Sequence, residues 1–207
     1  MYYCWGRLRQ SERRDMDTLF TALGKVLTPY GIYGVMGNHD YSYCYTKVAE
    51  AMEKNNVHLM EHKSYKLLKD GQHIIISGVR NPFDLKKNGD SPSQHFPADD
   101  FILLLTHTPD YAEDTDVSNA NLVLAGHTHG GQVSLFKKYS PVKHSIYGNR
   151  FLTGRKENSA GVPIIITNGL GTSRMNVRLF TPSEVVLVVL HKVEKNNLKK
   201  TAFGATF

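Results

Sequence analysis

Three apolar segments, each followed at once by a polar cluster that contains histidine, constrain the fold of this chain most strongly. They are residues 31–36, 101–105 and 121–125. Their length and composition predict short β-strands, the last two fully buried. In open α/β sheets the carboxyl ends of the strands meet at one edge, where ligands collect. The sequence therefore predicts a single rim lined by Asn38, His39, His107, His127 and His129.

The third cluster, residues 126–132, places His127 and His129 two positions apart on a glycine-rich turn. Two imidazoles on one rigid turn can reach one metal ion or a pair of ions. The flanking glycines permit a sharp turn and the close approach of a ligand. A surface loop that happens to hold two histidines is the alternative. Residues 133–136 alternate apolar and polar side chains and predict a further strand.

The rest of the pattern predicts an alternation of helices and strands within one domain. Helices are expected at 15–27, 45–55 and 111–116, and further strands at 57–60, 65–68, 73–77, 162–167 and 184–193. The polar segments 81–97 and 140–157 predict long loops, which we expect to shape a substrate entrance. We assign residues 1–193 to the domain and residues 194–207 to a basic tail.

The composition is that of an ordinary globular protein, with 207 residues and a net charge of +6. Much of the excess positive charge lies in residues 7–14 and 192–200. No basic stripe is interleaved with aromatic residues, so we expect no nucleic-acid partner. The basic tail is interpreted as a solvated segment, with contact to anionic lipid as the alternative.

Localisation is predicted from what the chain lacks. No stretch approaches about 20 apolar residues, the length that spans a membrane. No apolar segment precedes the charged run 7–14, as a signal peptide would require. Cys4 and Cys44 form no disulfide framework, so reduced thiols are expected. We therefore expect a cytoplasmic monomer, with peripheral contact at the membrane as an open alternative.

Three motifs, at residues 37–40, 106–109 and 126–129, together resemble those of the calcineurin-like metallophosphoesterases in spacing and order. The resemblance covers roughly residues 15–190. Residues 168–173, followed by 178–182 and an apolar segment, make it similar to a bacterial subgroup that includes the UDP-2,3-diacylglucosamine-hydrolysing phosphodiesterases. The resemblance implies an α/β fold, a two-sheet β-sandwich flanked by helices with a dinuclear metal centre at the strand ends.

Carried over to this sequence, the resemblance implies a role for each matching residue. Asn38, His107 and His127 would bind one metal ion, and His129 the other. His39, oriented by Asp40, would contact the substrate phosphate and protonate the leaving oxygen. Imidazole and amide ligands suit two divalent ions of Mn, Fe, Zn or Co. The reaction would be hydrolysis of a phosphomonoester, phosphodiester or pyrophosphate in a phosphorylated small molecule or lipid-linked nucleotide.

A second group of residues has weaker support. The backbone N–H groups of residues 169–173, with Arg174 or Arg178, are candidates for binding the anionic substrate. A plain turn is the alternative there. Structural roles are the alternative for three of the motif residues. Asn38 would be a turn residue, His107 would cap a strand end, and Asp40 would cap the helix that follows. The remaining histidines match no motif and are interpreted as structural or surface residues: His58, His62, His73, His95, His144 and His191.

Two motifs of the family are absent from this sequence. No Asp-x-His occurs in it, and Gly6-Arg7 stands where a Gly-Asp is expected. Arginine does not ligate metals and stays cationic. One nucleotide string that encodes residues 2–9 gives Ile-Thr-Val-Gly-Gly-Asp-Tyr-Val when read one base later. We therefore expect an amino-terminal truncation or frameshift and a missing first strand. The alternative is a catalytically impaired family member that binds at most one metal or an anion.

Overall fold

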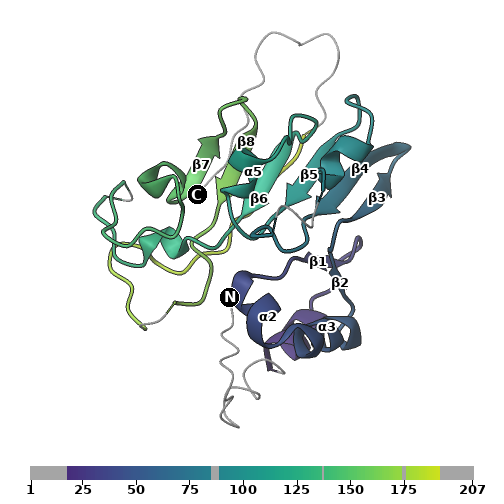
Figure 1. Ribbon diagram of the computed structural model, residues 1–207. Helices are drawn as coiled ribbons and strands as arrows, with labels where there is room; N and C mark the ends of the chain where they lie inside the picture. The colour runs from purple at the N-terminus through teal and green to yellow at the C-terminus, as the bar shows by residue number, and fades with distance from the viewer. Residues whose placement is uncertain (1–17, 85–88, 137, 174–175, 192–207) are drawn as a thin grey trace.

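Two β-sheets with helices beside them form the protein in a computed structural model, which describes residues 18–84, 89–136, 138–173 and 176–191 (Figure 1). The larger sheet has six strands in the order β3-β4-β5-β6-β8-β7. Its strands are β3 (Lys63–Lys69), β4 (Gln72–Gly78), β5 (Ile102–Leu105), β6 (Leu122–Ala125), β7 (Gly154–Glu157) and β8 (Pro163–Ile166). The four inner strands run parallel, and β3 and β7 pair antiparallel at the two edges.

The core of the larger sheet comes from its apolar inner strands. Leu104, Val123 and Ile164 are completely buried, each on a different inner strand. The short helix α5 (Tyr111–Asp114) joins the same core through its buried residues Tyr111 and Ala112. Strands that are buried on both faces read as continuous apolar runs. This explains why β5, β6 and β8 were recognisable in the sequence.

A smaller sheet lies beside two helices at one end of the molecule (Figure 1). β1 (Ile32–Gly34) pairs in parallel with β2 (Val57–Leu59). The connection between them contains α2 (Asn38–Tyr43) and α3 (Tyr45–Lys54). Residues 18–24 are helical as well, and Phe20 packs with α3 in one apolar cluster. Burial of these faces holds α3 in place, because so short a helix is marginal by itself in water.

Gly78, the last residue of β4, lies where the two sheets meet. A Cβ atom added to Gly78 would lie 2.2 Å from Cβ of Met60, which is completely buried. We expect Gly78→Ala to lower the free energy of unfolding by about 2 kcal/mol, because overpacking a core costs about 1–3 kcal/mol. Urea denaturation followed by circular dichroism measures the change.

Gly126→Ala is the matched control for this substitution. A Cβ at Gly126 meets its nearest atom only at 3.9 Å, so the added methyl group has room. Its effect on stability should stay below that of Gly78→Ala. Equal losses for the two variants would contradict the proposed steric role of Gly78.

The structure confirms the expected α/β class and most of the predicted elements. The helices predicted at 45–55 and 111–116 are present as α3 and α5, each slightly shorter than expected. In the described part of the helix predicted at 15–27, residues 18–24 are helical. β7 and a 3-10 turn, η3 (Gly148–Phe151), lie inside the segment 140–157 that was predicted to be a loop. Another such turn, η1 (Pro92–His95), lies inside 81–97.

Two predicted strands are wrong. Residues 133–136 form only isolated bridges at Val133 and Leu135, because Gln132 and Phe136 adopt positive φ angles of 58° and 53° and so interrupt the extended backbone. In the segment predicted as a strand at 184–193, the described residues 184–191 pair with no neighbouring strand of the described chain. Residues 192–193 lie outside the described part, as does the basic tail 194–207.

Two further predictions can be compared with the structure. In the described residues, we find no helix of the length and apolarity needed to cross a lipid bilayer. Cys44 takes part in a disulfide bond, so the expectation of a reduced thiol is wrong at this position.

Candidate functional site

Three strand ends bring Asn38, His107 and His127 together. His107 follows β5, His127 follows β6, and Asn38 begins the helix after β1. Asn38 Oδ1 lies 3.2 Å from His107 Nε2, and that nitrogen lies 3.0 Å from His127 Nδ1. Polar atoms of three residues that are far apart in the sequence therefore lie around one small volume. We call these residues the central trio.

Steric contacts fix the position of His107 within the trio. A Cβ atom on Gly37 would lie 2.8 Å from His107 Cε1, so only glycine leaves space for this ring. Phe83 lies edge-on to both imidazoles of the trio, with its ring centroid 5.9 Å from that of His107 and 5.3 Å from that of His127. Sequence reasoning missed Phe83, since an aromatic residue in a long loop carries no signal of where it packs.

The turn that carries His127 and His129 has a strained backbone. His127 and His129 have φ angles of 69° and 51°, which are uncommon for residues with a side chain. The hydroxyl of Thr128, between them, donates a 2.7 Å hydrogen bond to the carbonyl of Leu152. A Cβ on Gly130 would come within 2.3 Å of Asn168 Oδ1. The glycines of this motif therefore serve close packing as well as the turn.

Burial lowers the pKa of His107, His127 and His129. Desolvation, followed by the nearby His127, moves the pKa of His107 well below its usual value. Desolvation and the neighbouring His144 lower the pKa of His127 to about 4, and mainly desolvation lowers that of His129 to about 4. These imidazoles are therefore neutral at pH 7, which is the protonation state that binds metal ions.

His129 contacts the loop that follows β8. Its Nδ1 is 3.0 Å from the carbonyl oxygen of Gly171. The ring centroid of His144 lies 6.0 Å from those of both His127 and His129. His144 was predicted to be an ordinary structural or surface histidine. No motif could have selected it, because its position depends on how the loop 140–157 folds back.

Asp40 makes its hydrogen bond with the backbone. Its Oδ2 accepts a 2.8 Å bond from the N–H of Gly37 at the start of α2, which is the capping role weighed as an alternative. Burial raises the pKa of Asp40, and this hydrogen bond and the charge of His39 lower it in part. His39 also lowers the pKa of His107 and His127, so its ring is electrostatically coupled to the trio. Its role toward substrate stays a prediction.

Arg178 holds the loop that follows β8. Its guanidinium donates to the backbone carbonyls of residues in both flanking segments: His129, Asn168, Gly169, Gly171 and Thr181. This geometry makes Arg178 a positioning residue for the loop beside His129, and its predicted contact with substrate stays a prediction. Arg174 lies outside the described residues.

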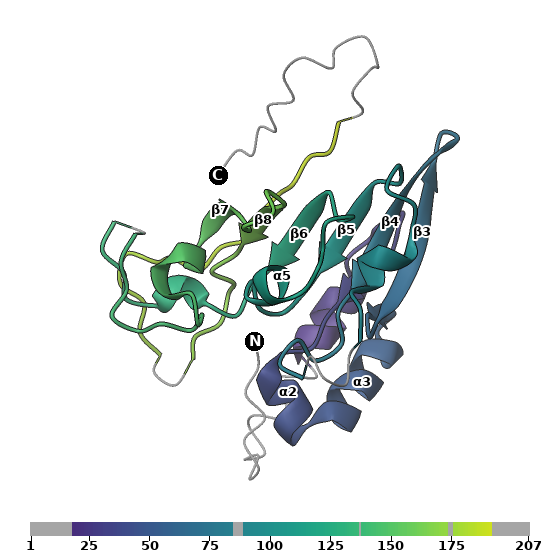
Figure 2. The ribbon, with the colours of Figure 1, turned by 45° about the horizontal axis from the view of Figure 1, so that its top comes forward.

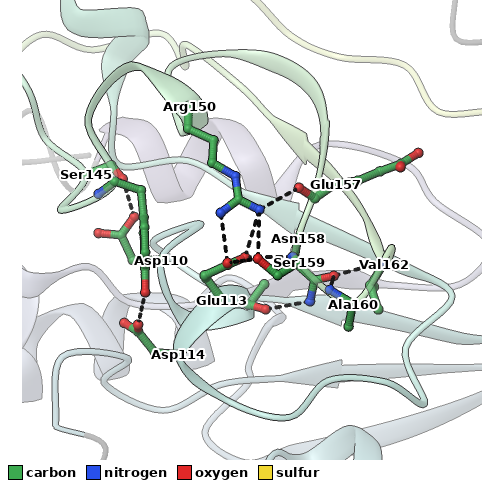
Figure 3. Close-up of polar contacts among 12 residues, drawn as sticks. Asp110, Glu113, Asp114, Ser145, Arg150, Glu157, Asn158, Ser159, Ala160 and Val162 are labelled. Carbon is green, nitrogen blue, oxygen red and sulfur yellow. Dashed lines mark hydrogen bonds and ion pairs between the residues drawn. The ribbon is translucent and has the colours of Figure 1, made fainter.

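A polar network anchors the loop that carries His144 (Figure 3). Asp110, in the turn after His107, accepts hydrogen bonds from the Ser145 hydroxyl and from the N–H of Ile146, the latter at 2.9 Å. Glu113 of α5 pairs with Arg150 at 2.8 Å. α5 thereby fixes the loop 140–157 against the end of β5. The position of His144 is set by these contacts rather than by local sequence.

The donor atoms of the trio form a partial ligand set for a metal cation. The trio offers an amide oxygen and two neutral imidazoles, a ligand set that suits transition-metal ions. Within the described part of the chain, no three or more His, Cys, Asp or Glu side chains are grouped so that they could hold a metal ion. The described residues therefore supply part of one coordination shell. A second ion at His129 would need ligands beyond those that they place there.

Comparison with known proteins identifies the family to which these motifs correspond. A family model described as calcineurin-like phosphoesterase matches residues 9–131. An uncharacterized metallophosphoesterase of Aquifex aeolicus is 26% identical over 190 residues, which cover 86% of this chain and 67% of that protein. The uncharacterized metallophosphoesterase YkuE of Bacillus subtilis is 28% identical over 170 residues, covering 81% and 59%.

A third relative, an uncharacterized metallophosphoesterase of Campylobacter jejuni, is 26% identical over 191 residues, covering 89% of this chain and 49% of its own length. The chain thus spans about half to two thirds of the length of these relatives. No solved structure matches it.

Proposed function

Because the chain belongs to the calcineurin-like phosphoesterase family, we propose that it catalyses metal-dependent hydrolysis of a phosphoester at the central trio. The observation that carries the proposal is the meeting of Asn38, His107 and His127 within hydrogen-bond distance of one another. If the three motifs form one metal site, these residues must lie together in the fold. Three unrelated surface residues would have no reason to do so.

The central trio would hold the cation, and the other residues act around it. A divalent cation supplies Lewis acidity toward the phosphoryl group and lowers the pKa of water. His107 and His127 are neutral at pH 7, so no proton has to leave before they bind. His39, which is coupled electrostatically to both rings, is the candidate to protonate the leaving oxygen. Phe83 lies edge-on to both rings and contributes an apolar wall to the site.

The substrate class is part of the proposal. Phosphomonoesters, phosphodiesters and pyrophosphates all suit such a site. The similarity of residues 168–173 to the subgroup that hydrolyses UDP-2,3-diacylglucosamine favours a lipid-linked nucleotide. A dinuclear centre, as the resemblance implies, would require His129 and additional ligands for the second ion.

One specific observation favours a second candidate function, an impaired family member that binds one metal or an anion. The trio contains no carboxylate, and the described residues offer no larger cluster of metal ligands. A neutral ligand set attracts a divalent cation less strongly than one with an anionic member. The two candidates differ in turnover, and both predict metal binding.

Metal loading and hydrolysis measured together test the proposal. The protein is stripped with EDTA and reloaded with Mn²⁺, and its metal content and hydrolysis of bis-p-nitrophenyl phosphate are measured. Changes to residues that merely support metal ligands cost about 10–100-fold in affinity or activity. We therefore expect His127→Ala, which removes a direct ligand, to reduce both by at least about 100-fold.

His95→Ala is the matched control, since His95 is exposed and lies in η1. It should leave metal content and hydrolysis unchanged. Metal binding by the wild type without hydrolysis above the His127→Ala level would support the impaired alternative. Metal content that does not respond to His127→Ala would overturn the assignment of the trio.

A further inference from the structure

Large apolar side chains are exposed at the tips of two loops beside the candidate site. Two of them are phenylalanines, Phe136 at 87% exposure and Phe180 at 63%. We call the following six residues the loop-tip patch: Leu135, Phe136, Tyr139, Val177, Leu179 and Phe180. Isolated exposed apolar residues are normal, but a contiguous group of them marks an interaction surface.

Backbone contacts hold the two loops together. The N–H of Ser134 donates to the carbonyl of Leu179 at 3.1 Å, and the N–H of Leu179 donates to the carbonyl of Gln132 at 2.7 Å. Leu135 and Tyr139 form a further bridge within the first loop. Both loops extend from the same end of the molecule, away from β3 and β4 (Figures 1 and 2). The backbones that carry the six residues therefore lie side by side.

The conformation of the two phenylalanines is unusual. Phe136 and Phe180 have φ angles of 53° and 57°, in the left-handed region that bulky residues rarely occupy. Such residues persist only where the surrounding structure holds them, and they cluster at functional sites. Here the strained residues are the two most exposed members of the patch.

Two exposed lysines accompany the patch. Lys138 lies within the first loop, and Lys143 lies shortly after it; both are exposed. Their positive charge complements an anionic partner.

We propose that the loop-tip patch docks on an anionic lipid bilayer. Exposed aromatic and aliphatic residues flanked by lysines are the combination that binds bilayer interfaces, through apolar burial and attraction to anionic headgroups. Gln132, which the second loop contacts, closes η2 (His129–Gly131). Docking would therefore bring the histidine cluster to the lipid surface. The inference does not require the site to be catalytic.

Vesicle binding by the full chain tests the proposal. Co-sedimentation is measured with vesicles of phosphatidylcholine alone and of equal parts phosphatidylcholine and phosphatidylglycerol. We expect binding to the anionic vesicles only, and we expect the double variant Phe136→Ser/Phe180→Ser to weaken it at least about tenfold. The double variant Lys138→Glu/Lys143→Glu should weaken it by at least about fivefold per lysine.

Matched controls separate the patch from general stickiness and from the basic tail. Leu27→Ser/Leu68→Ser removes two exposed apolar residues elsewhere, and Lys54→Glu/Lys66→Glu reverses two exposed charges on α3 and β3. Losses confined to the patch variants support the proposal. Equal losses in the controls, or no binding of the wild type to anionic vesicles, would overturn it. A dimer in sedimentation that only the patch variants dissociate would also overturn it.

Discussion

Lowering the pH from 7 to 5 is expected to reduce the free energy of unfolding of the metal-free protein by about 4 kcal/mol. In the folded protein, burial lowers the pKa of His127 and His129 to about 4, whereas unfolded histidine titrates near 6.5. Between pH 6.5 and 5 the unfolded chain binds these protons and the folded protein does not. One pKa unit corresponds to about 1.36 kcal/mol, so about 1.5 units give about 2 kcal/mol for each histidine.

The sign of the effect follows from where each group titrates. A histidine with a lowered pKa stabilises the fold fully above pH 6.5, and this contribution is lost as the pH falls toward 4. Asp40 and Asp110 act in the opposite direction, because burial raises their pKa and their folded forms take up protons first. His107, whose pKa is also lowered by burial, adds to the loss on acidification.

Urea denaturation in EDTA at pH 7, 6 and 5 measures this dependence. His127→Gln removes one titrating group and should reduce the loss between pH 7 and 5 by about 2 kcal/mol. His95→Gln, at an exposed position, should leave the slope unchanged. A slope that is the same in wild type and His127→Gln would show that burial of the trio does not control its protonation.

Replacement of Arg178 by alanine is expected to lower the free energy of unfolding by about 3 kcal/mol. A hydrogen bond to a charged group contributes about 1.5–3 kcal/mol, and buried carbonyls left without donors add a desolvation cost. The Arg178 guanidinium donates to five backbone carbonyls, among them those of His129 and Gly171. The Gly171 carbonyl in turn lies 3.0 Å from His129 Nδ1, so the loss should also loosen His129.

Arg178→Lys tests the geometric part of this account. Lysine keeps the charge but lacks the planar fork, so it should recover only a minor part of the stability. Arg155→Ala is the control, because the Arg155–Glu157 contact of 3.7 Å lies on the exposed surface and such pairs contribute less than about 1 kcal/mol. If Arg178 instead contacted substrate directly, Arg178→Ala would raise KM in the phosphodiester assay and leave stability unchanged.

The differences between expected and observed structure have identifiable causes. β5, β6 and β8 were predicted within one or two residues because buried parallel strands carry continuous apolar runs. The segments 133–136 and 184–191 have similar composition, yet neither forms a strand in the described chain. For 133–136 the positive φ angles of Gln132 and Phe136 break the extended backbone. Composition alone does not reveal such angles in residues other than glycine.

Some residues of the candidate site could be predicted from the sequence, and others could not. His107 and His127 follow the neighbouring parallel strands β5 and β6, so the strand-end pattern was sufficient to predict that these two meet. Asn38 follows β1 of the smaller sheet, and only the packing of the two sheets brings it to His107. His144 and Phe83 reach the same place through loops, whose paths depend on contacts such as Asp110 with Ile146. Arg178 was selected as a possible anion ligand, but its position showed that its donors bind backbone carbonyls.

The sequence by itself determined the α/β class, the inner strands and the family motifs, because apolar periodicity and strand-end clusters are local patterns. Only the tertiary structure decided how Asn38 of the smaller sheet reaches the histidines of the larger one, how His144 joins them, and where the loop-tip patch lies. Those features arise from packing between segments far apart in the chain, such as Gly37 against His107 and Leu179 against Ser134. A local pattern carries no information about contacts of that kind.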